Sequence, residues 1–367
     1  MSLTELPALR IADLVINPPI IQGGMGVRVS GARLAAAVAN EGCAGVIASV
    51  GLGMFEDFPG NRFVELNEEA LRQAIRSARM LSNGVIGVNV MVALSNYESL
   101  VRAAADEGAD FIVSGAGLPL DLPRLVGDKK IALIPIVSSA RALRIICQKW
   151  QRASGRLPDA VVVEGPRAGG HLGFKAEELD DRANLSLERL TTEVLEFVAT
   201  LERPIPVIPA GGIFDGEDIA RFLALGASGV QMATRFVCTY ECDVDERFKE
   251  AYLKATDADI AIIHSPVGMP ARVIRNSFVD RMERGETAPF HCKYQCLKTC
   301  DPATAPYCIA RVLVEAAKGV LDEAFVFAGS NAPRCHEIVS VKSLIAQLAA
   351  EAAAALAGAK MGTVPER

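Results

Sequence analysis

Residues 132–164 read ALIPIVSSARALRIICQKWQRASGRLPDAVVVE, and this stretch contains the pattern that decides the fold. An apolar run at 132–137 is followed by an amphipathic segment of helical length at 140–153, and a second apolar run follows at 160–163. Val- and Ile-rich runs without polar alternation are typical of parallel strands that are buried on both faces. The stretch therefore predicts one strand–helix–strand unit of an α/β protein.

The same alternation recurs up to residue 231. Strands are predicted at 19–22, 44–48, 86–89, 111–114, 132–137, 160–163, 206–209 and 229–231, and helices at 31–41, 68–82, 96–107, 119–126, 140–153, 186–201 and 216–225. Eight such strands close a (β/α)₈ TIM barrel, whereas an open doubly wound sheet has about five to seven strands and one glycine-rich loop after the first. Glycine and polar residues follow nearly every strand here, so the sequence favours the barrel.

No linker rich in Pro, Gly or Ser divides the chain. We expect residues 1–235 to form the barrel and residues 236–290 to form a helical elaboration over the active site. Residues 291–367 are expected to carry a cysteine cluster and C-terminal helices, near 308–319 and 339–357, that pack on the barrel. The predicted fold is thus an α/β barrel with a helical C-terminal elaboration.

Composition narrows the classes of function. Half of the 367 residues are hydrophobic, and 38 basic against 44 acidic residues give a net charge of −6 with no basic stripe. Nucleic acid is therefore an unexpected partner, and a small-molecule substrate is favoured. The N-terminal residues lack the basic start and apolar run of a signal peptide, and we expect no membrane-spanning segment and a cytoplasmic location.

In a βα barrel the reacting groups come from the C-terminal ends of the strands. The first strand is followed by QGGMG at 22–26, where consecutive glycines let the backbone approach a flat ligand. The third ends at Asn89, whose amide can meet the edge of a ring. A tight turn at the glycines and an Asn bonded to loop backbone are equally common alternatives.

Three later strand ends carry further chemistry. The sixth leads into EGPRAGGHLG at 164–173, where His171, one of four histidines in the chain, is a candidate for proton transfer; a structural capping role is the alternative. The seventh and eighth are followed by AGGI at 210–213 and QMAT at 231–234. Loops at these two places commonly bind phosphate through backbone N–H groups, so a phosphorylated ligand is predicted.

Together these strand ends resemble the nitronate monooxygenase family, formerly called 2-nitropropane dioxygenases, which includes FMN-type enoyl-acyl-carrier-protein reductases and an NADH:quinone reductase branch. The resemblance runs from about residue 18 to residue 234 and is carried by PIIQGGMG (19–26), GVN (87–89), AGGHLG (168–173), AGGI (210–213) and QMAT (231–234). It implies FMN as the cofactor and His171 as the catalytic residue.

The FMN contacts that the resemblance implies are Gly24, Met25, Gly26, Asn89, Ser138, Glu164, Gly169, Gly170, Gly211, Gly212, Gln231, Met232, Ala233 and Thr234. Two positions depart from the family pattern: many members carry Gln in place of Glu164 and Gly in place of Ala233.

Nitronate oxidation is the activity expected first. Reduction of an enoyl thioester, on acyl carrier protein or CoA, and NADH:quinone-type reduction with NAD(P)H are the alternatives.

The nine cysteines divide into two groups. Five are scattered, whereas Cys292, Cys296, Cys300 and Cys308 lie within seventeen residues. In a helix the first three would share one face, and in a loop all four would be free to converge. Four thiolates suit a [4Fe–4S] cluster or, less well, zinc. A loose resemblance to iron–sulfur flavoenzymes of the trimethylamine dehydrogenase type implies electron exchange with a ferredoxin-like carrier. Unliganded thiols packed as small hydrophobic groups are the alternative.

Residues 236–290 contain one further candidate group, Arg272, Arg275 and Asn276. These residues would suit the recognition of a substrate anion. Helix capping and pairing with Glu is the interpretation that we favour. The sequence does not indicate the oligomeric state.

Overall fold

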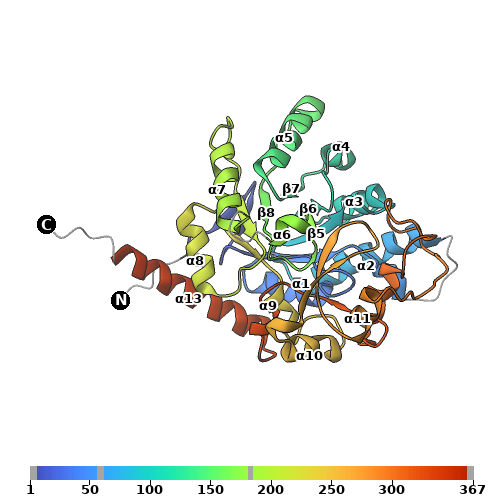
Figure 1. The fold of residues 1–367 in the computed structure, drawn as a ribbon. Coiled ribbons are helices and arrows are strands. Elements are labelled where there is room, and N and C mark those ends of the chain that lie inside the picture. The colour runs from blue at the N-terminus through green and yellow to red at the C-terminus, as the bar shows by residue number, and fades with distance from the viewer. Residues whose placement is uncertain (1–5, 56–61, 181–184, 362–367) are drawn as a thin grey trace.

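A ring of eight parallel strands forms the centre of the computed structural model, which describes residues 6–55, 62–180 and 185–361 (Figure 1). In ring order the strands are β3 (Ile20–Gln22), β11 (Val230–Met232), β10 (Val207–Ala210), β8 (Val161–Glu164), β7 (Ala132–Val137), β6 (Phe111–Gly115), β5 (Ile86–Met91) and β4 (Gly45–Ala48). The backbone N–H of Gln22 donates to the Ala44 oxygen at 2.9 Å, and that of Ala44 donates to the Ile20 oxygen at 3.0 Å. These bonds join the last strand to the first, and the barrel prediction is confirmed.

The strand predictions agree closely with the structure. Every predicted strand is present, and its ends lie within one residue of those observed, except that β5 continues for two residues past Asn89 to Met91. The strands could be predicted because each of them is a short continuous apolar run. Such runs are typical of parallel strands that are buried on both faces of the sheet.

Helices follow the strands and cover the outside of the ring (Figure 1). They are α1 (Ala32–Asn40), α2 (Phe63–Leu81), α3 (Tyr97–Asp106), α4 (Leu122–Val126), α5 (Ala140–Ser154), α6 (Ala176–Asp180), α7 (Leu187–Val198) and α8 (Gly216–Leu225). Short polar residues fix their ends: the Ser139 hydroxyl accepts from the backbone N–H of Ala142, and Gly155 ends α5 in the left-handed conformation. Among the predicted helices, α2 departs most, because it begins at Phe63 rather than at residue 68.

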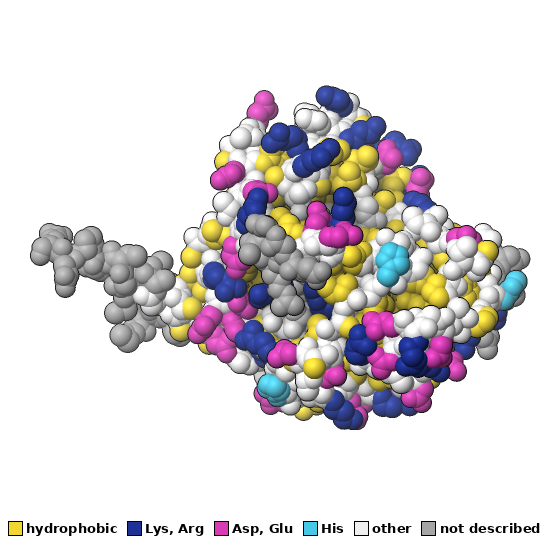
Figure 2. Space-filling view, in the orientation of Figure 1, with side chains coloured by type: hydrophobic (Ala, Val, Ile, Leu, Met, Phe, Trp, Pro, Cys, Tyr) yellow, Lys and Arg dark blue, Asp and Glu magenta, His cyan; other side chains and the backbone are white. Residues whose placement is uncertain are grey.

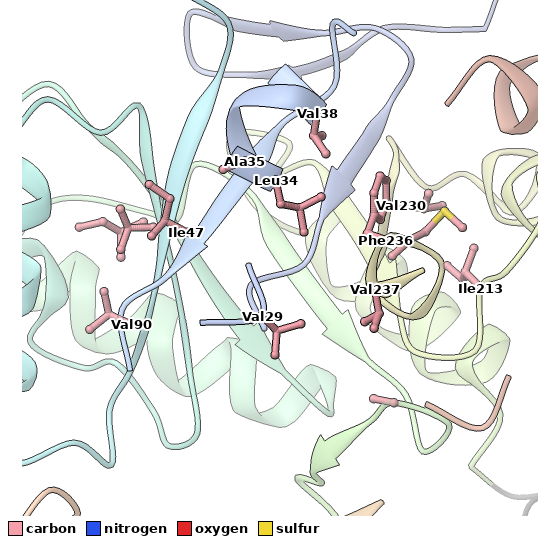
Figure 3. Packing of buried hydrophobic residues seen from close by; sticks show 14 of the residues in the cluster. Val29, Leu34, Ala35, Val38, Ile47, Val90, Ile213, Val230, Phe236 and Val237 are labelled. Carbon is pink, nitrogen blue, oxygen red and sulfur yellow. The ribbon is translucent and has the colours of Figure 1, made fainter. Parts of the chain in front are cut away.

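The core has two layers, and each strand contributes to both. In β8, Val162 faces the barrel interior, whereas Val161 and Val163 face the helices. Figure 3 shows the outer layer, where Leu34 of α1 lies in the same cluster as Val230. The interior is filled by side chains, and the hairpin of β1 (Leu9–Ile11) and β2 (Leu14–Ile16) contributes to the same inner cluster. The barrel is therefore a packed core, and a ligand site has to lie at a rim.

The prediction that 236–290 is helical is wrong in its middle. The segment has α10 (Glu246–Lys254) and α11 (Ser277–Glu283), which follow α9 (Thr234–Val237), but an antiparallel hairpin of β12 (Ile260–His264) and β13 (Pro270–Ile274) separates them. Two short strands, β9 (Gly170–His171) and β14 (Val326–Phe327), pair with β13. The β-branched runs flanking a turn at Gly268, whose φ is +81°, were the missed signal. The described residues also include the 3₁₀ turns η1 (Leu52–Phe55), η3 (Asp257–Asp259) and η4 (Ala332–Arg334).

The two predicted C-terminal helices are present as α12 (Ile309–Ala317) and α13 (Val341–Met361), and α13 packs against α8 (Figure 1). Contrary to expectation, one described segment, residues 341–358, is long and apolar enough to cross a membrane, with 33% of it buried in the protein. Its buried residues include Leu344, Leu348 and Ala352, which recur at helical spacing. Packing on the barrel therefore accounts for much of its apolar character.

Charges of both signs are mixed on the surface. Figure 2 shows Lys and Arg side chains interspersed with Asp and Glu over the visible face, with hydrophobic side chains gathered near its centre. No basic stripe crosses this face, in keeping with the charge balance of the sequence.

We predict that Gly45→Ala strongly destabilises the protein. A Cβ at this position would lie 1.9 Å from the carbonyl oxygen of Ala35, and this backbone oxygen in α1 cannot rotate away. The expected loss is about 3 kcal/mol in the free energy of unfolding, measured by urea denaturation. Gly358→Ala is the control, because a Cβ there meets nothing within 4 Å. Equal stability of the two variants would show that α1 and β4 are not in direct backbone contact.

Candidate functional site

The residues that follow the barrel strands line one cleft of about 470 Å³ at the carboxyl rim. The structure brings all fifteen residues predicted for FMN and catalysis to this cleft: Gly24, Met25, Gly26, Asn89, Ser138, Glu164, Gly169, Gly170, His171, Gly211, Gly212, Gln231, Met232, Ala233 and Thr234. Parallel strands in a closed ring place all their carboxyl ends at one rim, which explains the convergence.

Glycine is required at several of these positions. A Cβ on Gly24 would lie 2.4 Å from the Cβ of Asn89, and a Cβ on Gly169 would lie 2.5 Å from the carbonyl carbon of Ala328. Gly211 and Gly212 have φ values of +91° and +93°, which side chains rarely adopt. Packing within the protein thus requires glycine at these positions, and in the cleft lining these residues present backbone without side chains.

A segment far along the chain completes the wall beside Thr234. Ala328 and Gly329 line the cleft, and a Cβ on Gly329 would lie 2.7 Å from the Thr234 hydroxyl oxygen. The hydroxyl of Ser330 is buried without a hydrogen-bond partner among the described residues. Sequence reasoning missed this segment, although AGSN at 328–331 has the small and polar residues of the other cleft loops.

His171 lies in the cleft wall on β9. Its Nε2 is 2.8 Å from the hydroxyl oxygen of Ser265, and the ring of Phe327 meets the imidazole edge-on with centroids 5.1 Å apart. Burial lowers the pKa of the His171 imidazole to about 4. The ring is therefore neutral near pH 7, rather than poised to titrate there as an exposed histidine would be. A neutral imidazole offers one N–H donor and one acceptor nitrogen.

Glu164 is the last residue of β8 and also lines the cleft. Burial raises the pKa of its carboxyl group to about 7. Close to physiological pH this carboxyl group is thus partly protonated and able to donate as well as accept a hydrogen bond. A Gln at this position would retain the donor but never carry the charge.

Much of the remaining wall of the cleft is apolar, although Arg167 also lines it. Its lining includes Val27, Val50, Met54 and Leu94 from the barrel half and Phe248, Tyr252, Ile309, Ala310 and Leu313 from the C-terminal half. None of the latter five was singled out from the sequence, because apolar residues in helices give no signal that separates a cleft wall from a core.

The four clustered cysteines lie in a looped segment that is anchored to the loop after β5. The carbonyl oxygen of Cys296 accepts from the N–H of Ser95 at 3.0 Å, and the N–H of Lys298 donates to the Ala93 oxygen at 2.9 Å. The four residues line a second cavity of about 340 Å³: Cys292, Cys296, Cys300 and Cys308. Cys296 and Ile309 line both this cavity and the main cleft.

The four cysteines lie around one cavity, as they would if they shared a ligand, but their side chains are not arranged as a metal site. Within 6–55, 62–180 and 185–361 no group of three or more His, Cys, Asp or Glu side chains is arranged to hold a metal ion. This counts against zinc, whose tetrahedral ligation holds sulfurs about 4 Å apart. Burial raises the pKa of the Cys296 thiol to about 12, so it is protonated when unliganded. The metal assignment stays a prediction.

The interpretation of Arg275 and Asn276 as structural residues is confirmed. Arg275 pairs with Asp280 and Glu283 at 2.7 and 2.9 Å, and the Asn276 side chain caps α11 by accepting from the N–H of Val279 at 3.1 Å. Arg272 is buried and donates to the carbonyl oxygen of Ala168. This hydrogen bond joins β13 to the loop that carries His171.

We predict that Glu164→Gln stabilises the flavin-free protein more at high pH than at low pH. The folded-state pKa of Glu164 is raised, so its contribution to stability is complete below its ordinary pKa of 4.5 and is lost as pH rises through about 7. Gln does not ionise, so its contribution to the free energy of unfolding does not fall as the pH rises. The gain in unfolding free energy should be about 2 kcal/mol larger near pH 8 than near pH 5.5. Urea denaturation at both pH values measures it, and a pH-independent difference would contradict the buried carboxyl.

Comparison with known proteins agrees with this geometry. A family model described as nitronate monooxygenase matches residues 9–98 and 94–351. Over 273 residues the chain is 31% identical to a Mycobacterium tuberculosis protein named (3aS,4S,5R,7aS)-5-hydroxy-7a-methyl-1-oxo-octahydro-1H-indene-4-carboxyl-CoA dehydrogenase, covering 74% of this chain and 67% of that protein. It is 26% identical to a probable nitronate monooxygenase of Staphylococcus aureus, covering 74% and 79% of the two chains.

The fold comparison points the same way. The structure of FabK from Thermotoga maritima is similar with a TM-score of 0.73 at 28% identity, covering 94% of this chain and 95% of that one. The family match spans the barrel, the hairpin, the cysteine segment and most of α13. This chain therefore belongs to the nitronate monooxygenase family and is an oxidoreductase.

Proposed function

We propose that the cleft binds FMN and that the protein oxidises nitronates, with His171 as the catalytic residue. The observation that carries this proposal is the position of a partly buried, neutral imidazole in the wall of a cleft that all fifteen predicted site residues line. The cytoplasm is the proposed location, and the substrate is a small molecule.

The described residues fit the cofactor. The bare backbone at Gly24–Gly26 suits one face of the isoalloxazine ring, with Asn89 and Ser138 near its edge. Glu164 and Gly169 would lie along the ribityl chain. The phosphate would meet Gly211, Gly212 and residues 231–234. When bound, FMN supplies two-electron redox chemistry.

The chain's own residues supply binding, proton chemistry and a dry surrounding. His171 is neutral, so it either donates a hydrogen bond to a nitronate oxygen or takes the α-proton of a neutral nitroalkane, which forms the nitronate. The apolar residues of the cleft wall, such as Met54 and Leu313, exclude water from the cleft. A hydrogen bond between His171 and the substrate is stronger where water is excluded. In this proposal O₂ is the final electron acceptor.

A specific observation favours a second candidate, redox chemistry on an acyl thioester. The apolar wall contributed by α10 and α12 suits the hydrocarbon part of an acyl group better than a small nitronate. The relative from Mycobacterium tuberculosis is named for a carboxyl-CoA substrate. NAD(P)H would then be the electron donor, as it would in quinone reduction.

The cysteine cavity supports a further element of the proposal, a [4Fe–4S] cluster held by Cys292, Cys296, Cys300 and Cys308. A four-iron cluster keeps its thiolates further apart than a single ion does, in keeping with four thiols around a cavity of about 340 Å³. Because Cys296 also lines the cleft, electrons would pass between the flavin and a ferredoxin-like carrier through this wall.

We predict that His171→Gln lowers turnover by about 10²-fold or more, because proton transfer or oxyanion binding at the imidazole is lost. Nitronate-dependent oxygen uptake without NADH identifies the first candidate, and NADH oxidation that depends on an enoyl thioester identifies the second. Flavin absorbance of the purified variant is the control for cofactor binding. Unchanged turnover in a flavin-loaded variant would remove His171 from the mechanism.

We predict that protein purified without air contains about four iron atoms per chain and that Cys300→Ser loses them. Elemental analysis for iron and zinc measures this. Cys147→Ala is the matched control, because Cys147 is buried in α5 and lies outside the cysteine segment. Absence of both metals in the wild-type protein would leave the four thiols as packing residues.

A further inference from the structure

We propose that Ser265 positions His171 by donating a hydrogen bond to Nε2, which leaves the proton on Nδ1 and makes His171 a hydrogen-bond donor toward an oxygen of the substrate. This inference rests on the proposed function and deepens it, since it selects the donor role over the base role. The substrate it implies develops negative charge on an oxygen, as a nitronate or a thioester enolate does.

The contact between Ser265 and His171 is short, and Ser265 is shielded from solvent. The Ser265 hydroxyl oxygen lies 2.8 Å from Nε2 of His171, and Ser265 is 0% exposed. Its backbone is fixed by a turn, in which its N–H donates to the Met269 oxygen at 3.0 Å and its carbonyl accepts from Gly268 at 2.9 Å. A hydroxyl held this rigidly has a defined direction toward the ring.

The direction of the hydrogen bond follows from counting partners. In the described chain the Ser265 hydroxyl has one hydrogen-bond partner, Nε2 of His171. A buried hydroxyl proton needs an acceptor, and the only acceptor on offer is the lone pair of Nε2. The neutral ring then carries its proton on Nδ1. Since Nε2 is occupied, Nδ1 is the nitrogen left for a ligand in the cleft.

The same hairpin holds both residues. His171 pairs with Ala271 of β13, the N–H of Leu172 donates to the Pro270 oxygen at 2.9 Å, and Ser265 follows directly after β12 in the same hairpin. The hairpin thus sets the position of both the imidazole and the hydroxyl. This gives the hairpin, unexpected from the sequence, a role in the site.

The test is the tautomer of His171, read by ¹⁵N nuclear magnetic resonance on the flavin-loaded protein. Four histidines give few signals, the other three are exposed, and the signal that is absent in His171→Gln belongs to His171. We expect an unprotonated Nε2 and a protonated Nδ1 in the wild type. Ser265→Ala should shift the ring toward the Nε2–H form, whereas Ser265→Thr, which retains a hydroxyl, and Ser154→Ala, in α5, should not.

A wild-type ring with the proton on Nε2, or a tautomer unchanged in folded Ser265→Ala, overturns the proposal. If Ser265→Ala does not fold, the wild-type tautomer alone decides. This measurement needs no substrate, so it stands apart from a failure of the proposed activity. Once a substrate is known, Ser265→Ala should lower kcat by about 10-fold with a smaller change in KM. It should have no further effect in the His171→Gln background.

Discussion

Closure of the sheet between β3 and Ala44 is the constraint on which the rest of the structure depends. A closed ring of parallel strands has one carboxyl rim, so residues as distant as Gly24 and Thr234 meet in one cleft. The interior beneath that rim is filled by side chains such as Phe111, whose ring occupies the space that a side chain at Gly87 would need. The cleft therefore has a rigid floor, and its walls are set by loops.

Much of the barrel and its rim could be predicted from the sequence because both depend on local patterns. Apolar runs identified the strands, and the residues that follow them lie in the cleft as expected. The hairpin of β12 and β13 has a local signal in its β-branched runs, but its place in the site could not be predicted from it, since β13 pairs with β9 and β14 from distant parts of the chain. Pairing between distant segments depends on tertiary structure rather than on a local period.

The electrostatics of the site also lay beyond the sequence. An exposed histidine titrates near neutral pH, but burial beside Phe327 keeps the His171 imidazole neutral there. Burial also raises the pKa of Glu164, so near pH 7 the cleft contains a neutral imidazole and a partly protonated carboxyl group. These shifts arise from the surrounding walls, and about a quarter of the residues in those walls belong to the C-terminal segments. The motif identifies the groups, and the walls determine their charge.

Part of the cleft wall is formed by residues that come late in the sequence. Ala328, Gly329 and Leu313 lie some eighty or more positions beyond the last barrel strand, β11. During synthesis the ring can close while these residues are still within or behind the ribosome. A complete barrel would then exist before a complete binding site, so cofactor loading would await release of the finished chain and would report that the whole polypeptide had folded.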